Sequence, residues 1–96
     1  MSIITKTYYF GHDTKICDQD ILIRIMGELH KTIINPLVSV NTKKEDYQLH
    51  EGIDHYTSEI KITYDSDDIT VDDYDMSSAI RKSILDLLII YYGRKL

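Results

Sequence analysis

An acidic run between residues 65 and 75 is the part of this sequence with the clearest chemical potential. Six of its eleven residues are aspartates, and none is a lysine, arginine or histidine. Carboxylates at this density can keep a turn solvated and cap a helix, hold a hard cation such as Ca²⁺, or present negative charge to a basic partner. These three interpretations have to be separated by the spacing of the residues.

The spacing does not fit an EF-hand calcium loop. Such a loop needs oxygen ligands at its first, third and fifth positions, glycine at the sixth and glutamate at the twelfth. Counted from Asp65, the third position is Asp67, but Ile69 and Thr70 stand at the fifth and sixth and Met76 at the twelfth. An EF-hand is therefore excluded, while a weak cation site and a solvated turn remain alternatives.

The third interpretation is that the acids imitate a nucleic-acid backbone. Alternate residues of a strand point the same way about 6.6 to 6.8 Å apart, and basic clefts that hold nucleic acid gain affinity by neutralising closely spaced negative charge. Tyrosines among the acids would add the flat contact area that is enriched in interfaces. The predicted partner-binding residues are Glu59, Tyr64, Asp65, Asp67, Asp68, Asp72, Asp73, Tyr74 and Asp75.

Charge is distributed unevenly along the whole chain, with the negative excess in its middle third. Residues 1–44 carry a balance of +2 and residues 76–96 a balance of +3, whereas residues 45–75 carry −10. Direct binding of nucleic acid would place eleven carboxylates of this middle segment near phosphates, which is unfavourable. The expected partner is therefore the basic surface of a nucleic-acid-binding protein, and not nucleic acid itself.

A metal site is the main alternative, because His50, Asp54 and His55 lie close together in the sequence. Two helical zinc ligands must be four residues apart to share a face. The two histidines are five apart and flank Gly52, so only a loop site remains. A small metal-dependent enzyme built on these three residues is the competing hypothesis.

Other catalytic chemistry has little support. The chain contains no glycine-rich phosphate loop and no Gly-x-Ser-x-Gly elbow, so we expect no cofactor and no enzymatic activity. The single cysteine, Cys17, precedes a predicted helix, and a staple with Leu22 would bury its thiol.

The elements that must position these residues follow from hydrophobic periodicity. Residues 3–10 favour a strand, and a helix begins at Asp18 and ends before Pro36. A short strand follows at 37–40, and residues 41–57 form a loop or hide part of a strand. Residues 58–64 and 69–71 predict a hairpin, and a second helix spans 75–93. The predicted fold is a single α+β domain with a small antiparallel or mixed sheet, two helices on one face and the order β-α-(β)-β-β-α.

The second helix is apolar over a wider arc than one core contact needs. Its stripe of Ile80, Ile84, Leu87, Leu88 and Tyr91 would face the sheet. Four more residues, Leu85, Ile89, Ile90 and Tyr92, lie outside this stripe. They predict either a homodimer interface, which would make the chain a structural subunit, or burial against residues 41–57.

This element order, with an acidic hairpin and a terminal helix, resembles small acidic regulators such as the DinI family. The size and charge are similar to those of phage anti-CRISPR proteins. The resemblance implies an inhibitor or regulator, in the second case a viral protein, and it carries over no functional residue. The lone cysteine, together with the absence of a secretory leader and of an apolar stretch of about 20 residues, predicts a cytoplasmic location without membrane contact.

Overall fold

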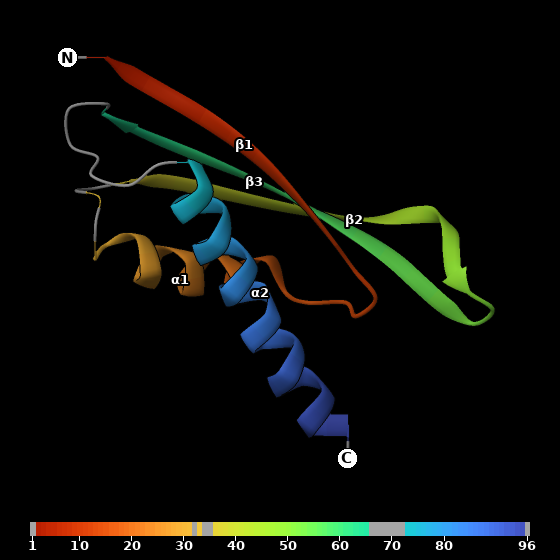
Figure 1. Ribbon diagram of the computed structural model, residues 1–96. Coiled ribbons are helices and arrows are strands. Elements are labelled where there is room, and N and C mark those ends of the chain that lie inside the picture. Colours follow the sequence, from red (N-terminus) through yellow and green to blue (C-terminus); the bar gives the residue numbers. More distant parts are fainter. Residues whose placement is uncertain (1, 32, 34–35, 66–72, 96) are drawn as a thin grey trace.

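Strands and helices follow each other in the order β-α-β-β-α in the computed structural model, which describes residues 2–31, 33, 36–65 and 73–95. The predicted α+β class is confirmed. Figure 1 shows the arrangement of the elements. They are β1 (Ile3–His12), α1 (Asp18–Leu29), β2 (Leu37–His50), β3 (Ile53–Asp65) and α2 (Asp73–Lys95).

The three strands of this part of the chain form one antiparallel sheet with β3 in the centre and the order β1-β3-β2. β1 pairs with β3 without interruption, from Ile3 opposite Asp65 to His12 opposite Tyr56. β2 pairs with the other side of β3, but its register shifts twice between Lys44 and His50. Both sides of β3 are therefore occupied, while β1 and β2 are the edges.

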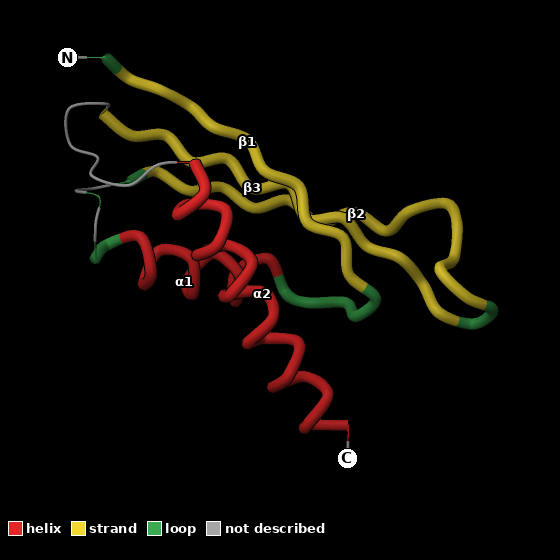
Figure 2. The backbone as a smooth tube through the Cα atoms, viewed as in Figure 1, coloured by secondary structure: helices red, strands yellow, loops and turns green. Residues whose placement is uncertain are grey.

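Alternation along β3 explains why the sheet has one buried face. Ile60, Ile62 and Tyr64 are buried together with Ser58, whereas Lys61 between them is exposed, as a two-residue period requires. Both helices lie on this buried face, as predicted, and Figure 2 shows them on the same side of the three strands. The opposite face of the sheet has no helix of the described residues over it.

The helices bury one stripe each against this face. α1 buries Ile21, Ile25 and Leu29 completely, and α2 buries Met76, Ile80 and Ile84. Two details of α1 differ from expectation. Its N-cap is Cys17, whose thiol is exposed and makes no capping hydrogen bond, so the predicted staple is wrong. The α-helix also ends at Leu29, well before Pro36, and the Ile33 N–H then donates to the Leu29 carbonyl at 2.8 Å.

Residues 41–57 hide parts of two strands and are not a loop. They contain the second half of β2, a turn at Glu51 and Gly52, and the first half of β3. Gly52 has φ of 81°, which glycine adopts without the steric cost that a Cβ brings. The strand at 58–64 pairs with β1 and β2, and the expected hairpin partner at 69–71 lies outside the described residues.

The β2–β3 hairpin makes the molecule elongated. Its outer part, residues 44–56, reaches beyond the two helices (Figure 1), and the extents are 49 × 27 × 20 Å. Among the described helices, none combines the length and apolarity needed to cross a bilayer.

Candidate partner-binding site

Four of the nine predicted partner-binding residues lie at the end of β3 and the start of α2. Asp65 is the last residue of β3, and Asp73, Tyr74 and Asp75 form the first turn of α2. We call these four residues the acidic end. Negative charge in a first helical turn is stabilised by the exposed N–H groups there, which explains why α2 starts within the run. The structure does not describe Asp67, Asp68 and Asp72, which lie between them in the sequence.

Two residues of the predicted set do not belong to this end. Tyr64 is only 6% exposed and packs in the hydrophobic core, so its ring is not available as a contact for a partner. Glu59 lies halfway along β3, opposite Tyr9 of β1, and accepts an ion pair from Lys61 at 3.5 Å. The two residues were expected on one acidic ridge of a hairpin. Tyr64 lies in the core instead, and Glu59 lies on the open face of the sheet.

Three acids of the β2–β3 hairpin form ion pairs with lysines of the same hairpin. Lys43 pairs with Glu45 at 3.8 Å, and Lys44 pairs with Asp54 at 3.4 Å. The hydrogen bond from Gln48 and the charge of Lys44 hold the pKa of Asp54 below its ordinary value. These pairs leave the segment from 65 to 75, where the sequence places no base, as the main source of the protein's negative charge.

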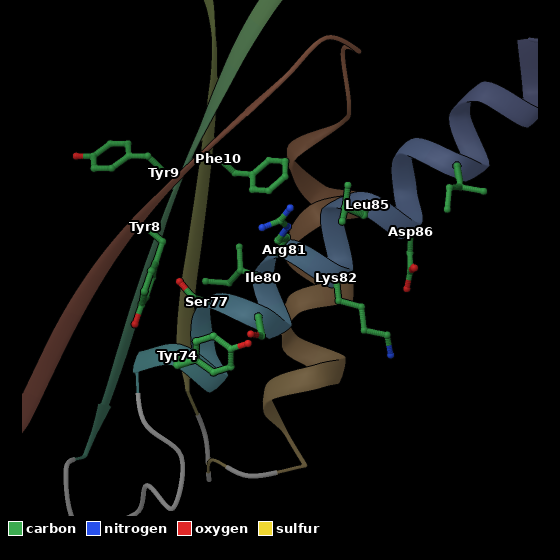
Figure 3. A pocket seen from close by; sticks show the side chains of 12 residues that line it. Tyr8, Tyr9, Phe10, Tyr74, Ser77, Ile80, Arg81, Lys82, Leu85 and Asp86 are labelled. Carbon is green, nitrogen blue, oxygen red and sulfur yellow. The ribbon is translucent and has the colours of Figure 1, made fainter.

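A groove of about 830 Å³ lies between β1 and α2 and meets the acidic end at Tyr74. Tyr8, Tyr9 and Phe10 line it from β1, and Tyr74 is 76% exposed. Figure 3 shows Tyr74 and Ser77 at the end where α2 begins, with Arg81 and Leu85 farther along the helix. Exposed aromatic and aliphatic side chains beside a charged rim are typical of protein-binding surfaces.

The four residues predicted as an oligomer interface are divided between three places. Leu85 and Ile89 line the groove and are 41% and 70% exposed, so they are not covered by residues 41–57. Ile90 faces α1, where it shares a small pocket with Ile23. The Tyr92 hydroxyl donates a hydrogen bond to Asp13. Two of the four predicted residues are thus on one continuous surface.

The alternative metal site is not assembled. Asp54 and His55 are consecutive in β3 and therefore point to opposite faces of the sheet. The Asp54 carboxylate contacts Lys44 and Gln48, while the His55 ring stacks on Tyr47 with a centroid distance of 5.2 Å. No group of three or more potential ligands that could hold a metal ion occurs in the described part of the chain. The prediction of a site from His50, Asp54 and His55 is wrong for this reason.

A buried chain of hydrogen-bonded polar side chains connects the three strands. His12 Nδ1 donates to the Thr14 carbonyl at 2.8 Å, and Nε2 lies 2.8 Å from Ser58 Oγ, which lies 2.8 Å from Thr42 Oγ1. Burial, partly offset by the Thr14 carbonyl, lowers the pKa of His12 below 6.5. The neutral ring then accepts from Ser58, which accepts from Thr42. Ser58 is 0% exposed, so this serine–histidine pair has no surface from which a substrate could reach the hydroxyl.

Two tyrosines attach the end of α2 to the β1–α1 connection. The Tyr91 hydroxyl donates to Asp20 at 2.6 Å and accepts from the Cys17 N–H at 3.4 Å, while Tyr92 donates to Asp13. The hydrogen bond to a carboxylate raises the pKa of each tyrosine, and the bond from Tyr92 lowers that of Asp13. These contacts fasten the last turns of α2 to Asp13 and to the start of α1.

Sequence reasoning missed the groove and the buried chain. The groove is made by elements separated by more than sixty residues, and no local pattern reports such a contact. For His12 a signal was present, because it shares the two-residue period of Tyr8 and Phe10 in β1.

Comparison with protein-family models, with curated proteins and with solved structures finds no match to this chain.

Proposed function

We propose that this is a non-enzymatic binding protein that inhibits or regulates a nucleic-acid-binding protein by occupying its basic site. The observation that carries this proposal is the charge of residues 65–75, with six aspartates and no base, next to the exposed ring of Tyr74. A single-signed field attracts a basic surface over a long range. An exposed tyrosine in the same segment can supply the buried contact that charge alone does not give.

The division of the acids supports the same function. The hairpin acids Glu45, Asp54 and Glu59 are paired with lysines of the sheet, so their charge is largely neutralised within the protein. The acids of residues 65–75 have no base in their own segment, which begins at the end of β3 and runs into the first turn of α2. The same excess of negative charge opposes binding of the chain to nucleic acid or to an anionic membrane. We propose that the protein acts in the cytoplasm.

The experiment is affinity capture of the partner with matched charge variants. One variant replaces all six aspartates of residues 65–75 with asparagine, and the control replaces the paired acids (Glu45→Gln, Asp54→Asn, Glu59→Gln). We expect the first to abolish capture and the control to retain it, with both variants folded by circular dichroism. Nucleic acid of the partner's preferred type should release the chain, because both compete for one site.

Two further measurements sharpen the test. Affinity for the captured partner should fall steeply with added salt, and Tyr74→Ala should weaken it by roughly thirtyfold, as for the truncation of an interface anchor. Capture that is unchanged in the six-asparagine variant would show that the acidic segment only keeps the chain in solution.

A further inference from the structure

The two edges of the sheet are protected very differently from pairing with another strand. β2 has four consecutive charged residues at 43–46, a register shift in the same place, and Pro36 directly before its first residue. Charges, irregular register and proline are the devices by which proteins prevent edge-to-edge association. β2 is therefore built to remain an edge.

β1 carries only one of these devices, a single lysine. It is ten residues long, pairs with β3 in unbroken register, contains no proline and has Lys6 as its single Lys, Arg, Asp or Glu residue. Within the described part of the chain its other side pairs with no strand. A long, regular, mostly uncharged edge is a template for a further strand.

The groove beside this edge supplies an apolar surface at the same place. Leu85 and Ile89 of α2 point into it next to the β1 residues Tyr8, Tyr9 and Phe10. A strand added to β1 would therefore bring its own side chains, or a helix behind it, against the exposed Ile89. Backbone hydrogen bonds and burial of apolar area would act together.

We propose that the occupant is a second copy of this chain, with the two β1 strands paired antiparallel about a twofold axis. This pairing makes one continuous six-stranded sheet and places both α2 helices on the same face, with each Leu85 and Ile89 turned toward the axis. Each surface is its own complement, and the assembly closes at two copies.

Charge selects the antiparallel arrangement. The acidic end lies at the beginning of β1, because Ile3 pairs with Asp65. The end of α2 lies beyond the other end of β1, because Tyr92 bonds to Asp13, and the sequence gives α2 the bases Arg94 and Lys95 there. Antiparallel pairing brings the acidic end of one copy toward the basic helix end of the other, whereas parallel pairing would place two acidic ends together.

The dimer goes beyond the proposed function and leaves it intact. Arg94 and Lys95 offset only part of the charge of the six aspartates in residues 65–75, so each end keeps a negative field. The two acidic ends would lie at opposite corners of the assembly, and a bivalent complex with two partner molecules would result.

The test is sedimentation over a wide range of concentration, combined with residue-resolved amide exchange. The expected species has twice the mass of the 11.2 kDa chain. Ile89→Glu should weaken self-association by roughly tenfold or more. Ile23→Glu is the matched control, because Ile23 is 60% exposed on α1 outside the groove, and it should leave the dimer unchanged.

Amide exchange identifies the surface independently of any substitution. In an antiparallel edge strand, only alternate residues direct their N–H groups toward the neighbouring strand. Consecutive protected amides along β1 are expected in the dimer, while the part of β2 from Leu37 to Lys44 keeps the alternating pattern of an edge. A monomer at high concentration, or a dimer in which β1 shows the alternating pattern, overturns the proposal.

Discussion

His12 is the residue whose ionisation is most closely tied to the fold. Its ring lies between Phe10 and Tyr56, at centroid distances of 6.4 and 6.0 Å, and both nitrogens are used in the buried chain to Thr14 and Ser58. A charged imidazolium at this place would lose most of its hydration. Folding therefore favours the neutral ring, and acid works against it.

The first residue-scale prediction concerns pH. Because burial lowers the pKa of His12 from 6.5, the unfolded chain takes up the proton first. Stability is then complete above about pH 6.5 and falls as the pH is lowered through this value, by at most about 1.4 kcal/mol per pH unit. Urea denaturation at about pH 7.5 and about pH 5.5 measures the fall.

Two variants isolate this contribution. His12→Gln should remove much of the loss between these pH values, whereas His30→Gln, at an exposed position after α1, should retain it. The lowered pKa values of Asp13 and Asp54 act in a separate window. Their contributions are present above pH 3.8 and are lost below it. An equal loss in the His12→Gln variant would contradict the assignment.

The candidate site was predictable at this scale only in part. The acidic composition of residues 65–75 follows directly from residue types. The burial of Tyr64 was also readable, because Tyr64 shares a face with Ile60 and Ile62 in a strand of two-residue period. A tyrosine among acids was interpreted as a contact residue, although its periodicity placed it in the core.

At the scale of elements, sequence periodicity succeeds where helices cover the strands. The central part of β3 and both helices pack on one core, so their buried apolar residues recur with the period of the element. β1 is predicted from its β-branched and aromatic residues instead. The outer part of the hairpin reaches beyond the helices, and neither of its faces needs to be apolar. Its charged residues gave no strand signal, although Gly52 marked the turn.

At the scale of elements, replacing two glycines by alanine is expected to change the stability of the protein in opposite directions. Gly52→Ala should destabilise the protein by about 1 kcal/mol, because a Cβ is strained at φ of 81°. Gly27→Ala should stabilise it by about 0.5 to 1 kcal/mol, because a Cβ inside α1 would have nothing within 4 Å. Thermal denaturation measures both, and shifts in the same direction would contradict the backbone argument.

At the scale of the whole molecule, the negative charge concentrated in residues 45–75 opposes folding. That segment carries −10 within a protein of net charge −5, and the folded state holds these charges closer together than the unfolded chain does. Self-repulsion of this kind lowers the free energy of unfolding. Salt relieves it, because the Debye length shrinks from about 30 Å at 0.01 M to about 8 Å at 0.15 M.

The whole-molecule prediction is that salt stabilises the fold. The urea midpoint should rise between about 0.01 and 0.15 M sodium chloride. The rise should be smaller in a variant with Asp67, Asp68 and Asp72 changed to asparagine than in one with Glu45 and Glu59 changed to glutamine, because those two acids are already paired. A midpoint independent of salt in the unmodified protein would show that its own bases balance the acidic segment.

The length of β3 has a practical consequence. This strand has Ile53, next to the hairpin turn, at one end and Asp65 at the other, so twelve residues of extended chain separate the turn from the acidic end. A biotin or fluorophore attached through Glu51→Cys, with the exposed Cys17 replaced by serine, would tether the molecule at the hairpin tip, away from the acidic end. A biosensor surface made in this way would present the acidic end of each directly tethered copy outward.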